Sequence, residues 1–276
     1  MRKFYCLWIL AFIIVFMLMP TAAVQARSQT RAGTVPAGTE FSSNWSGYAV
    51  TAANKTTPLQ AISGTWRVPA AQANGKAAAA QWIGLGGFAS NNLLQIGTIE
   101  AVYNNHRVIE LFWEKLPDMA HNIIKISSGT AVSASISQNG AGVWQLTAIM
   151  IKPNGARITK TIQVAGDVSY DSSMEQSAEW INEDPSNNTG SLYKLANTGT
   201  LSFTNLSVNN QSLTALGLTR HPLAVTSSAK RLLLSPSSLK SHGTAFSVLN
   251  LSHTAHPKKV KQARHRFRIS HHKLSK

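Results

Sequence analysis

The stretch "TAVSASISQNGAGVWQLTAIMIKPNGARITKTIQVAG", residues 130–166, decides the fold class. It contains three runs, 132–136, 143–151 and 158–164, in which apolar residues alternate with polar or small ones. A period of two is the pattern of a half-buried β-strand. Asn-Gly pairs stand between the runs, and both residue types tolerate the positive φ of hairpin turns. The stretch therefore predicts a three-stranded β-meander.

Similar short runs occur on both sides of the meander. Outside the first 26 residues, no run combines a 3.6-residue period with end caps, so no helix is expected. A dozen short strands without helices predict an all-β fold, an antiparallel sandwich or barrel. The other strands are expected at residues 45–50, 62–68, 79–85, 93–99, 108–113, 177–183, 199–206 and 245–251.

The first 26 residues have the order of a secretory signal peptide. Two basic residues precede an apolar run over 4–19, and small residues follow up to Ala26, where we expect cleavage and hence secretion. An uncleaved anchor is the alternative, but the run is shorter than the roughly 20 residues that span a bilayer. Cys6, the single cysteine, lies in this segment, so the mature chain has no disulfide and no thiol nucleophile.

The rest of the chain divides into three parts. Residues 27–40 are small and polar and are interpreted as a linker or short pro-segment, and 41–252 form the predicted β-sandwich domain. Residues 253–276, the basic tail, carry eight Lys or Arg, five of the nine histidines and no acid. That composition is typical of a disordered polycationic segment. It favours adhesion to an anionic cell-surface polymer. The alternative is a solvated tail without a partner. Because the chain is expected to be secreted, no specific nucleic-acid partner is expected, and the protein is expected to be a monomer.

Common catalytic motifs are absent from the sequence. There is no Gly-x-Ser-x-Gly elbow, His-Glu-x-x-His zinc motif, phosphate loop or Asp-Thr/Ser-Gly triplet. A serine triad stays open, because its members need only meet in space. No metal or cofactor is expected, and the domain histidines, which lack ligand spacing, are interpreted as surface or turn residues: His106, His121, His221 and His242.

The segment "SAEWINED", residues 177–184, places carboxylates inside a predicted strand. Alternation puts Glu179, Ile181 and Glu183 on one face and Trp180 on the other. A carboxylate in such a strand is costly unless its face lines a polar groove or the group is hydrogen-bonded. An exposed sheet face is the plain alternative.

Eight segments, in order over about residues 40–252, resemble the glutamic peptidases, or eqolisins, which are secreted acid endopeptidases with a two-sheet β-sandwich of the lectin-like jelly-roll type. The resemblance implies a catalytic pair, Gln95 in "LLQIG" and Glu179 in "AEWI", without metal, cofactor or covalent intermediate. Glu179 would act as general base on a water, ionising near its usual value of about 4.3, and Gln95 would hydrogen-bond the oxyanion. The segments are "SSNWSGYAV", "ISGTWRVP", "QWIGLGG", "NLLQIGT", "FWEKLPD", "SAEWINED", "GTLSFTN" and "SPSSLKSHGTAFSV".

The resemblance also implies supporting residues. Trp82 would line the groove, while Glu114 and Glu183 would lie near it and tune Glu179 or share a proton with it. The chain departs from the family pattern at two acidic positions. Gly86 stands where the family has the Asp of Trp-x-Gly-x-Asp-Gly, and Ile99 stands four residues after Gln95, with Glu100 displaced by one.

The leading hypothesis is thus a secreted acid endopeptidase acting on proteins or peptides. One rival is a secreted glycan-binding or glycoside-hydrolysing β-sandwich, which would use two carboxylates and would not require Gln95. The carboxylates for it are Glu110, Glu114, Glu179 and Glu183. A third hypothesis is an adhesive wall protein in which the basic tail is the functional part.

Overall fold

The predicted meander forms three neighbouring antiparallel strands in the computed structural model: β8 (Ala131–Asn139), β9 (Val143–Ile151) and β10 (Arg157–Ala165). Alternate side chains of β9 are buried, as a period of two requires. Gly155, in the Asn-Gly pair between β9 and β10, has φ 83°, a conformation that glycine adopts without steric cost. The meander prediction is confirmed.

The structure describes residues 35–54, 57–103, 106–139, 142–187 and 189–253, and the backbone of 266–267. These residues belong to one compact unit. The predicted signal peptide, and the predicted linker up to residue 34, lie outside them, as does most of the basic tail. No helix in the described ranges is long and apolar enough to cross a bilayer.

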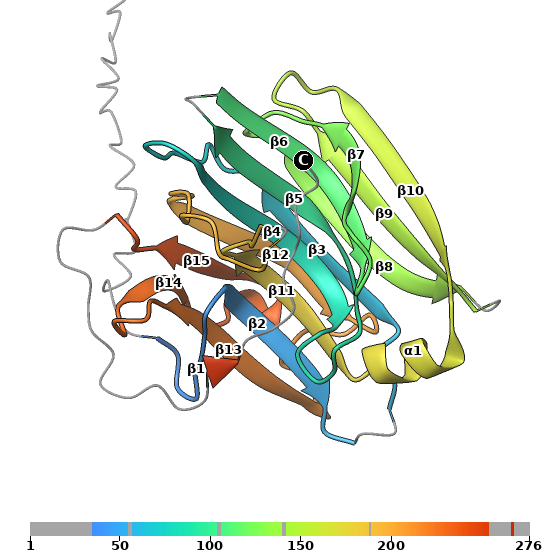
Figure 1. Ribbon diagram of the computed structural model, residues 1–276. Helices are drawn as coiled ribbons and strands as arrows, with labels where there is room; N and C mark the ends of the chain where they lie inside the picture. The colour runs from blue at the N-terminus through green and yellow to red at the C-terminus, as the bar shows by residue number, and fades with distance from the viewer. Residues whose placement is uncertain are drawn as a thin grey trace, which may run out of the picture. The chain divides into compact units, whose positions relative to one another are not determined.

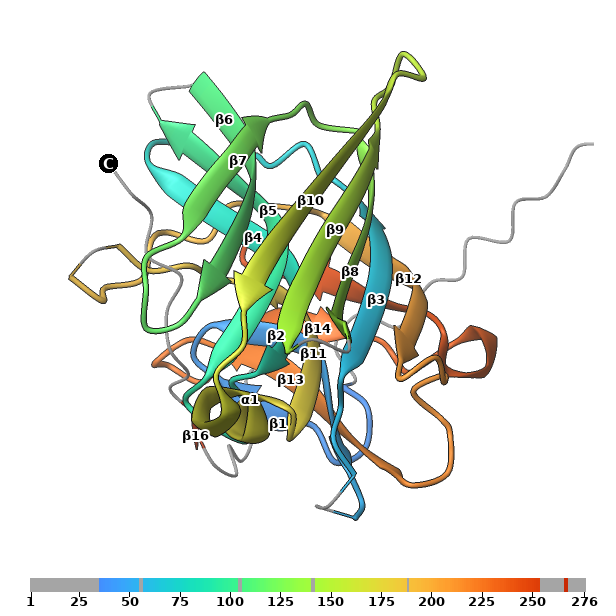
Figure 2. The same cartoon turned by 90° about the vertical axis from the view of Figure 1, so that its right-hand side faces the viewer.

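All described strands except β1 and β16 form one hydrogen-bonded path that folds over into two layers (Figures 1 and 2). The fold-over lies where β13 pairs with β14. The all-β sandwich prediction is confirmed. The first layer runs β7 (His121–Lys125), β6 (His106–Lys115), β5 (Leu93–Tyr103), β4 (Ala77–Gly86), β11 (Ser177–Glu183), β2 (Trp45–Ala52) and β13 (Leu218–Thr226). The second runs β10, β9, β8, β3 (Ala61–Arg67), β12 (Thr200–Val208), β15 (Phe246–Asn250) and β14 (Leu232–Pro236).

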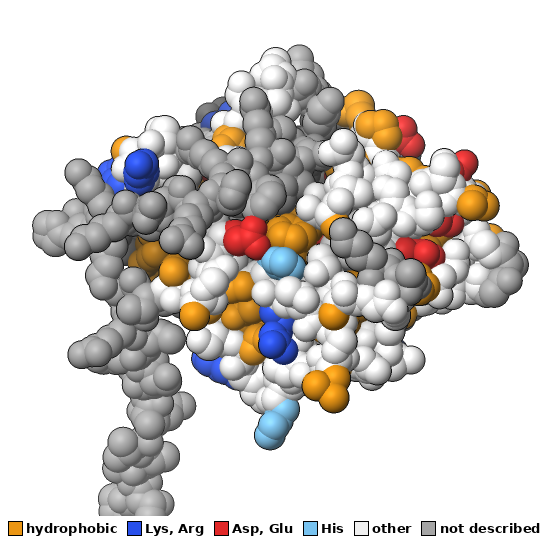
Figure 3. Space-filling view, turned by 90° about the horizontal axis from the view of Figure 1, so that it is seen from below, with side chains coloured by type: hydrophobic (Ala, Val, Ile, Leu, Met, Phe, Trp, Pro, Cys, Tyr) orange, Lys and Arg blue, Asp and Glu red, His pale blue; other side chains and the backbone are white. Residues whose placement is uncertain are grey.

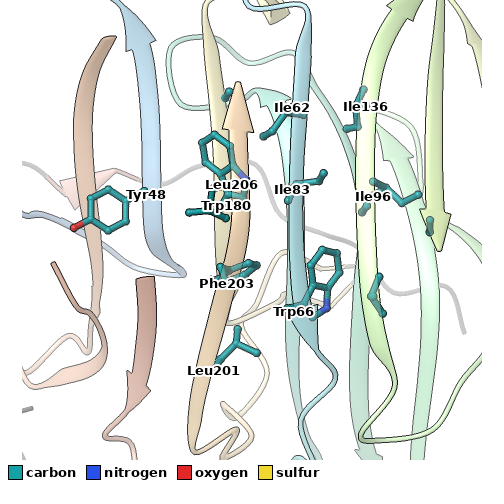
Figure 4. Close-up of a cluster of buried hydrophobic side chains, with 14 of the residues drawn as sticks. Tyr48, Ile62, Trp66, Ile83, Ile96, Ile136, Trp180, Leu201, Phe203 and Leu206 are labelled. Atoms are coloured by element: carbon teal, nitrogen blue, oxygen red, sulfur yellow. The ribbon is translucent and has the colours of Figure 1, made fainter. Parts of the chain in front are cut away.

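The main core lies between the layers (Figure 4). Trp180 and Ile83 enter it from the first layer, and Trp66 and Phe203 enter it from the second. Burial of such aromatic and branched side chains is the main stabilising contribution in a chain without disulfides. On the face drawn in Figure 3, hydrophobic side chains are dispersed among polar ones instead of forming one patch.

A second, smaller apolar cluster lies on the opposite face of the first layer. It contains Trp45, Trp82, Leu93, Phe112 and Ile181. Every residue of β4 and β11 is buried, since the main core covers one face of these strands and the smaller cluster covers the other. The middle of the first layer is therefore shielded from solvent on both sides.

The expectation of no helix is wrong at α1 (Val168–Met174). Asp167 caps it, because the Asp167 carboxylate accepts a hydrogen bond from the backbone N–H of Tyr170 at 2.9 Å. Seven residues give only two turns, too few for a helical period to be recognised. Further elements were not predicted: β1 (Glu40–Ser42), β7, β13, β14, a 3-10 turn at Ser241–Gly243, and β16 (Arg266–Phe267).

Candidate active site

Strand register brings six residues of the first layer into one line across the sheet. Residues that pair directly in antiparallel strands project to the same face, so these side chains share one face, here called the site face. We call the line the site row. It runs His221, Ala49, Glu179, Gly84, Gln95 and Glu114, on β13, β2, β11, β4, β5 and β6.

The site row therefore unites Glu179 and Gln95, the two residues that the sequence predicts as a catalytic pair. Only Gly84 stands between them, on β4. Neighbouring strands lie about 4.8 Å apart, which places the two backbones about 10 Å from each other. Gly84 has no side chain, and the side chains of Leu93 and Trp82 pack closely over it.

Glu179 is completely buried. Neither of its carboxylate oxygens accepts a hydrogen bond of standard geometry from the described residues. Burial raises the pKa of the Glu179 carboxyl well above its usual value, although the Ser177 hydroxyl and the Phe88 backbone favour the ionised form. The expectation that Glu179 ionises near its usual value is therefore wrong for this state of the protein.

Gln95 is held by its neighbour in the row. Its Nε2 donates a hydrogen bond to Glu114 Oε2 at 2.6 Å, which fixes which end of the amide is the donor. Oε1 of Gln95 has no hydrogen-bond partner among the described residues. Gln95, like Glu179, is buried.

A family model described as "Peptidase A4 family" matches residues 43–245. The chain belongs to the Peptidase A4 family. It is accordingly a glutamic peptidase, a hydrolase of peptide bonds. Because the family is one of peptidases, this membership decides against the hypothesis of a glycan-binding or glycoside-hydrolysing protein. A comparison with curated proteins finds no match.

Solved structures agree with the fold. Scytalido-glutamic peptidase, solved with a transition-state analogue inhibitor, has a TM-score of 0.60 and 21% identity, and the match covers 75% of this chain and 98% of that one. SCP-B, of the eqolisin family, solved with the tripeptide Ala-Ile-His, has a TM-score of 0.56, 21% identity and the same coverage. Aspergilloglutamic peptidase from Aspergillus niger has a TM-score of 0.51 and 22% identity, over 63% of this chain and 99% of that one.

Trp82 packs over Gly84, the residue that lies between Glu179 and Gln95 in the site row of this glutamic peptidase. A Cβ atom built on Gly84 would lie 3.0 Å from Cζ3 of Trp82 and 2.7 Å from Cδ1 of Leu93. Trp82 itself is buried and packs edge-on against Trp45, with ring centroids 4.6 Å apart. The indole thus lies over Gly84, and its role in lining a groove stays a prediction.

Glu183 holds the indoles of Trp82 and Trp45 in place by hydrogen bonds. Its Oε2 accepts a hydrogen bond from Trp82 Nε1 at 2.8 Å, and its Oε1 accepts bonds from Trp45 Nε1 and Asn44 Nδ2 at 3.3 and 3.2 Å. The hydrogen bonds observed for Glu183 and Glu114 therefore go to the indoles, Asn44 and Gln95. That either of them tunes Glu179 or shares a proton with it stays a prediction.

The two departures from the family pattern have structural reasons. Glu100 projects to the main-core face, opposite to Gln95, because a shift of one residue along a strand reverses the face. It cannot take the role of the acid that the pattern places at Ile99. Gly86 has φ 84°, and a Cβ there would lie 2.1 Å from the carbonyl oxygen of Asn92. An aspartate does not fit at that position without a backbone shift.

Sequence reasoning missed the end of the site row at His221. Its Nδ1 lies 2.9 Å from Glu40 Oε1, its Nε2 lies 3.2 Å from Thr51 Oγ1, and its ring packs on Phe88 at 4.6 Å. His221 ties β1 to the sheet and is half-buried. No local signal marks it, since its place depends on the pairing of β13 with β2.

Proposed function

We propose that this glutamic peptidase is a secreted endopeptidase in which Glu179 and Gln95 carry out peptide hydrolysis. The observation that supports the proposal is the site row. A carboxylate and an amide occupy one face, two strands apart, with Gly84 between them.

The reaction needs only these two groups and water. The ionised Glu179 carboxylate takes a proton from water as the water oxygen bonds to the scissile carbonyl carbon. The carbonyl electron pair moves to oxygen, and this oxyanion accepts a hydrogen bond from Gln95 Nε2. When the C–N bond breaks, its electron pair stays on nitrogen, which takes the proton from Glu179. A carboxylic acid and an amine leave, and Glu179 is ionised again.

Glu114 has a positioning role in this scheme. By accepting one Nε2 hydrogen of Gln95 at 2.6 Å, it presents the other to the developing oxyanion. A donor that is already oriented costs no reorganisation during the reaction. Trp82, held by Glu183, limits how far a bound peptide can move.

Secretion and the substrates follow from other parts of the chain. The signal-like order of residues 1–26 supports export, and peptidase membership supports proteins or peptides as substrates. The basic tail supports contact with an anionic cell-surface polymer.

Two substitutions test the proposed pair. Glu179→Gln and Gln95→Ala should each lower casein or haemoglobin digestion by about a hundredfold or more, since a general base and an oxyanion donor each contribute at least that factor. The matched controls are Glu175→Gln and Gln163→Ala, away from the site row, and both should retain activity. Pepstatin in the assay removes aspartic peptidases. Wild-type rates in both site variants would refute the assignment.

A further inference from the structure

Three buried polar side chains lie on the main-core face of the first layer, behind the site face. Thr98, Gln81 and Asn182 are on β5, β4 and β11, and each is 0% exposed. Thr98 pairs directly with Gln81, and Gln81 pairs directly with Asn182, so the three side chains share one face. We call them the polar row. The reaction proposed above uses none of them.

The polar row follows the same three strands as the proposed catalytic pair. Each of its members stands three residues along its strand from a member of the site row: Thr98 from Gln95, Gln81 from Gly84, and Asn182 from Glu179. An odd offset places the two rows on opposite faces of one layer. A movement of β4 against β5 or β11 therefore displaces both rows together.

Side-chain hydrogen bonds run through the polar row without a break. Thr98 Oγ1 donates to Gln81 Oε1 at 3.1 Å, and Gln81 Nε2 donates to Asn182 Oδ1 at 3.2 Å. Trp66 Nε1, on β3 of the second layer, donates to Thr98 Oγ1 at 3.0 Å. Because an indole N–H is a donor only, the Thr98 hydroxyl gives its own hydrogen to Gln81, which fixes the orientation of the Gln81 amide.

Asn182 connects the other end of the polar row to the second layer. Its Nδ2 donates to Thr198 Oγ1 at 3.5 Å, and the same oxygen accepts a hydrogen bond from Asn250 Nδ2, on β15, at 3.3 Å. Trp66 and Thr198 thus hold the two ends of the row. Three neighbouring strands of the first layer are tied to one another and to the layer behind them.

The site row has no comparable link between the proposed catalytic residues. Gly84 lies between them and has no side chain, and Gln95 Nε2 donates to Glu114, on the side away from Glu179. The placement of Gln95 against Glu179 therefore depends on how β4 is held between β5 and β11.

The sequence of β4 needs a marker of register. Residues 77–80 are four alanines, whose equal side chains do not distinguish one register from another that differs by two residues. After such a shift, Ala79 or Ile83 would stand between Thr98 and Asn182. Buried polar groups of both neighbours would then lose their partners, which costs free energy.

We propose that Thr98, Gln81 and Asn182 are positioning residues of this peptidase. Their hydrogen bonds hold β5, β4 and β11 in the register and spacing that set Gln95 against Glu179. Buried polar groups can specify one arrangement in this way while adding little to stability. The proposal rests on the assignment of Gln95 and Glu179 as the catalytic pair, but its structural part is measurable without catalysis.

Two substitutions of Thr98 separate hydrogen bonding from packing. Thr98→Val keeps the shape of the side chain and removes the hydroxyl that joins Trp66 to Gln81. Thr98→Ser keeps the hydroxyl and removes a methyl group from the core. We expect Thr98→Val to lower kcat for a short peptide at least about tenfold, with KM changed less than about twofold, because small shifts between reacting groups are costly to catalysis. Thr98→Ser should keep the kcat of the parent.

Urea unfolding under the assay conditions gives the folded fraction of each variant, and kcat is expressed per folded enzyme. Equal values of kcat in Thr98→Val and Thr98→Ser overturn the proposal. A kcat that falls in both variants in proportion to their loss of stability overturns it as well, since packing alone would then account for the effect.

Gln81→Met tests the middle of the polar row, because it removes both side-chain hydrogen bonds of Gln81, and it should lower kcat in the same way. Gln60→Met is the matched control. Gln60 Nε2 also donates two hydrogen bonds, to Gln138 Oε1 at 2.9 Å and to Glu175 Oε1 at 2.8 Å, but next to β3 in the second layer. The control should keep its kcat. An equal kcat in the two variants overturns the proposal, and the two Thr98 variants decide the case if Gln81→Met does not fold.

Amide hydrogen exchange measures the positioning without catalysis. Thr98→Val and Gln81→Met should speed exchange in β4, β5 and β11 and leave β9 and β10 unchanged, because these bonds oppose local opening of the three strands. If Glu179→Gln and Gln95→Ala cleave at the parent rate while exchange in the three strands is faster, the catalytic assignment fails and the hold on the strands stands. If the catalytic pair is confirmed while kcat and exchange are unchanged in both polar-row variants, the pair stands and the positioning role fails.

Discussion

If Glu179 is the general base, as proposed, its burial sets the pH range of the reaction. A general base works only when ionised, and burial raises the pKa of Glu179 well above its usual value. The ionised fraction therefore rises with pH through that raised pKa. We expect the acid limb of kcat/KM against pH, measured with a short peptide, to lie above pH 4.5, so that activity is lost in strong acid.

Two features of the measurement make this outcome decisive. A peptide substrate has no fold of its own to lose in acid, and the far-ultraviolet circular dichroism of the enzyme at each pH shows whether it stays folded. Full activity at pH 3 would contradict the prediction and show that Glu179 becomes solvated when substrate binds.

Single residues differ in how well the sequence predicts their roles. Alternation alone places Glu179 and Glu183 on one face, and the resemblance selects Gln95 as the partner of Glu179. Neither predicts that Glu179 is buried, because a strand pattern tells which residues share a face but not what covers that face. The hydrogen bonds that Glu183 accepts from two indoles could not be predicted either, because they join strands that are far apart in the sequence.

At the scale of elements, β4 separates the strands that carry the proposed catalytic pair, and Leu93 and Trp82 pack closely over its Gly84. Gly84→Ala would place a methyl group 2.7 Å from Leu93 Cδ1 and 3.0 Å from Trp82 Cζ3. Overpacking of this kind costs about 1–3 kcal/mol of stability. We expect Gly84→Ala to lower kcat/KM for a peptide at least about tenfold, because small shifts between reacting groups are costly to catalysis.

Gly64→Ala, on β3, is the matched control for that change. Its Cβ would lie 2.9 Å from Trp180 Cδ1 in the main core, away from the site face. Urea unfolding should show comparable losses of stability in the two variants. If both also lose activity equally, the effect of Gly84→Ala is one of stability, and the absence of a side chain at Gly84 has no special role in catalysis.

Elements were predictable where alternation is regular and missed where it is broken. The meander and β11 follow the period of two closely. β13 was missed because Pro222 lies in its interior, and proline normally argues against a paired strand. β7 has five residues and α1 has two turns, too short for either period to stand out.

At the scale of the whole molecule, buried carboxylates link folding to pH. Burial raises the pKa of Glu100 to about 8 and that of Asp184 to about 8, the latter with a contribution from the charge of Glu183. The folded protein therefore keeps protons that the unfolded chain releases above about pH 4.5. Stability from these groups is fully present below that pH and is lost as pH rises to about 8.

Glu100→Gln should remove much of that loss. Glu100 lies in the main core beside Gln81 and Thr98, with neither oxygen accepting a hydrogen bond of standard geometry. An amide of the same shape never ionises. The free energy of unfolding should therefore fall less between pH 5 and pH 8 in Glu100→Gln than in the parent, by on the order of several kcal/mol, and the melting temperature should fall less as well.

The measurement is scanning calorimetry in a Gln95→Ala background, which avoids self-digestion. Glu175→Gln is the control for the removal of a carboxylate outside the main core. Parallel melting curves for parent and Glu100→Gln would show that Glu100 does not hold its proton in the folded state, and would assign the pH dependence to other groups.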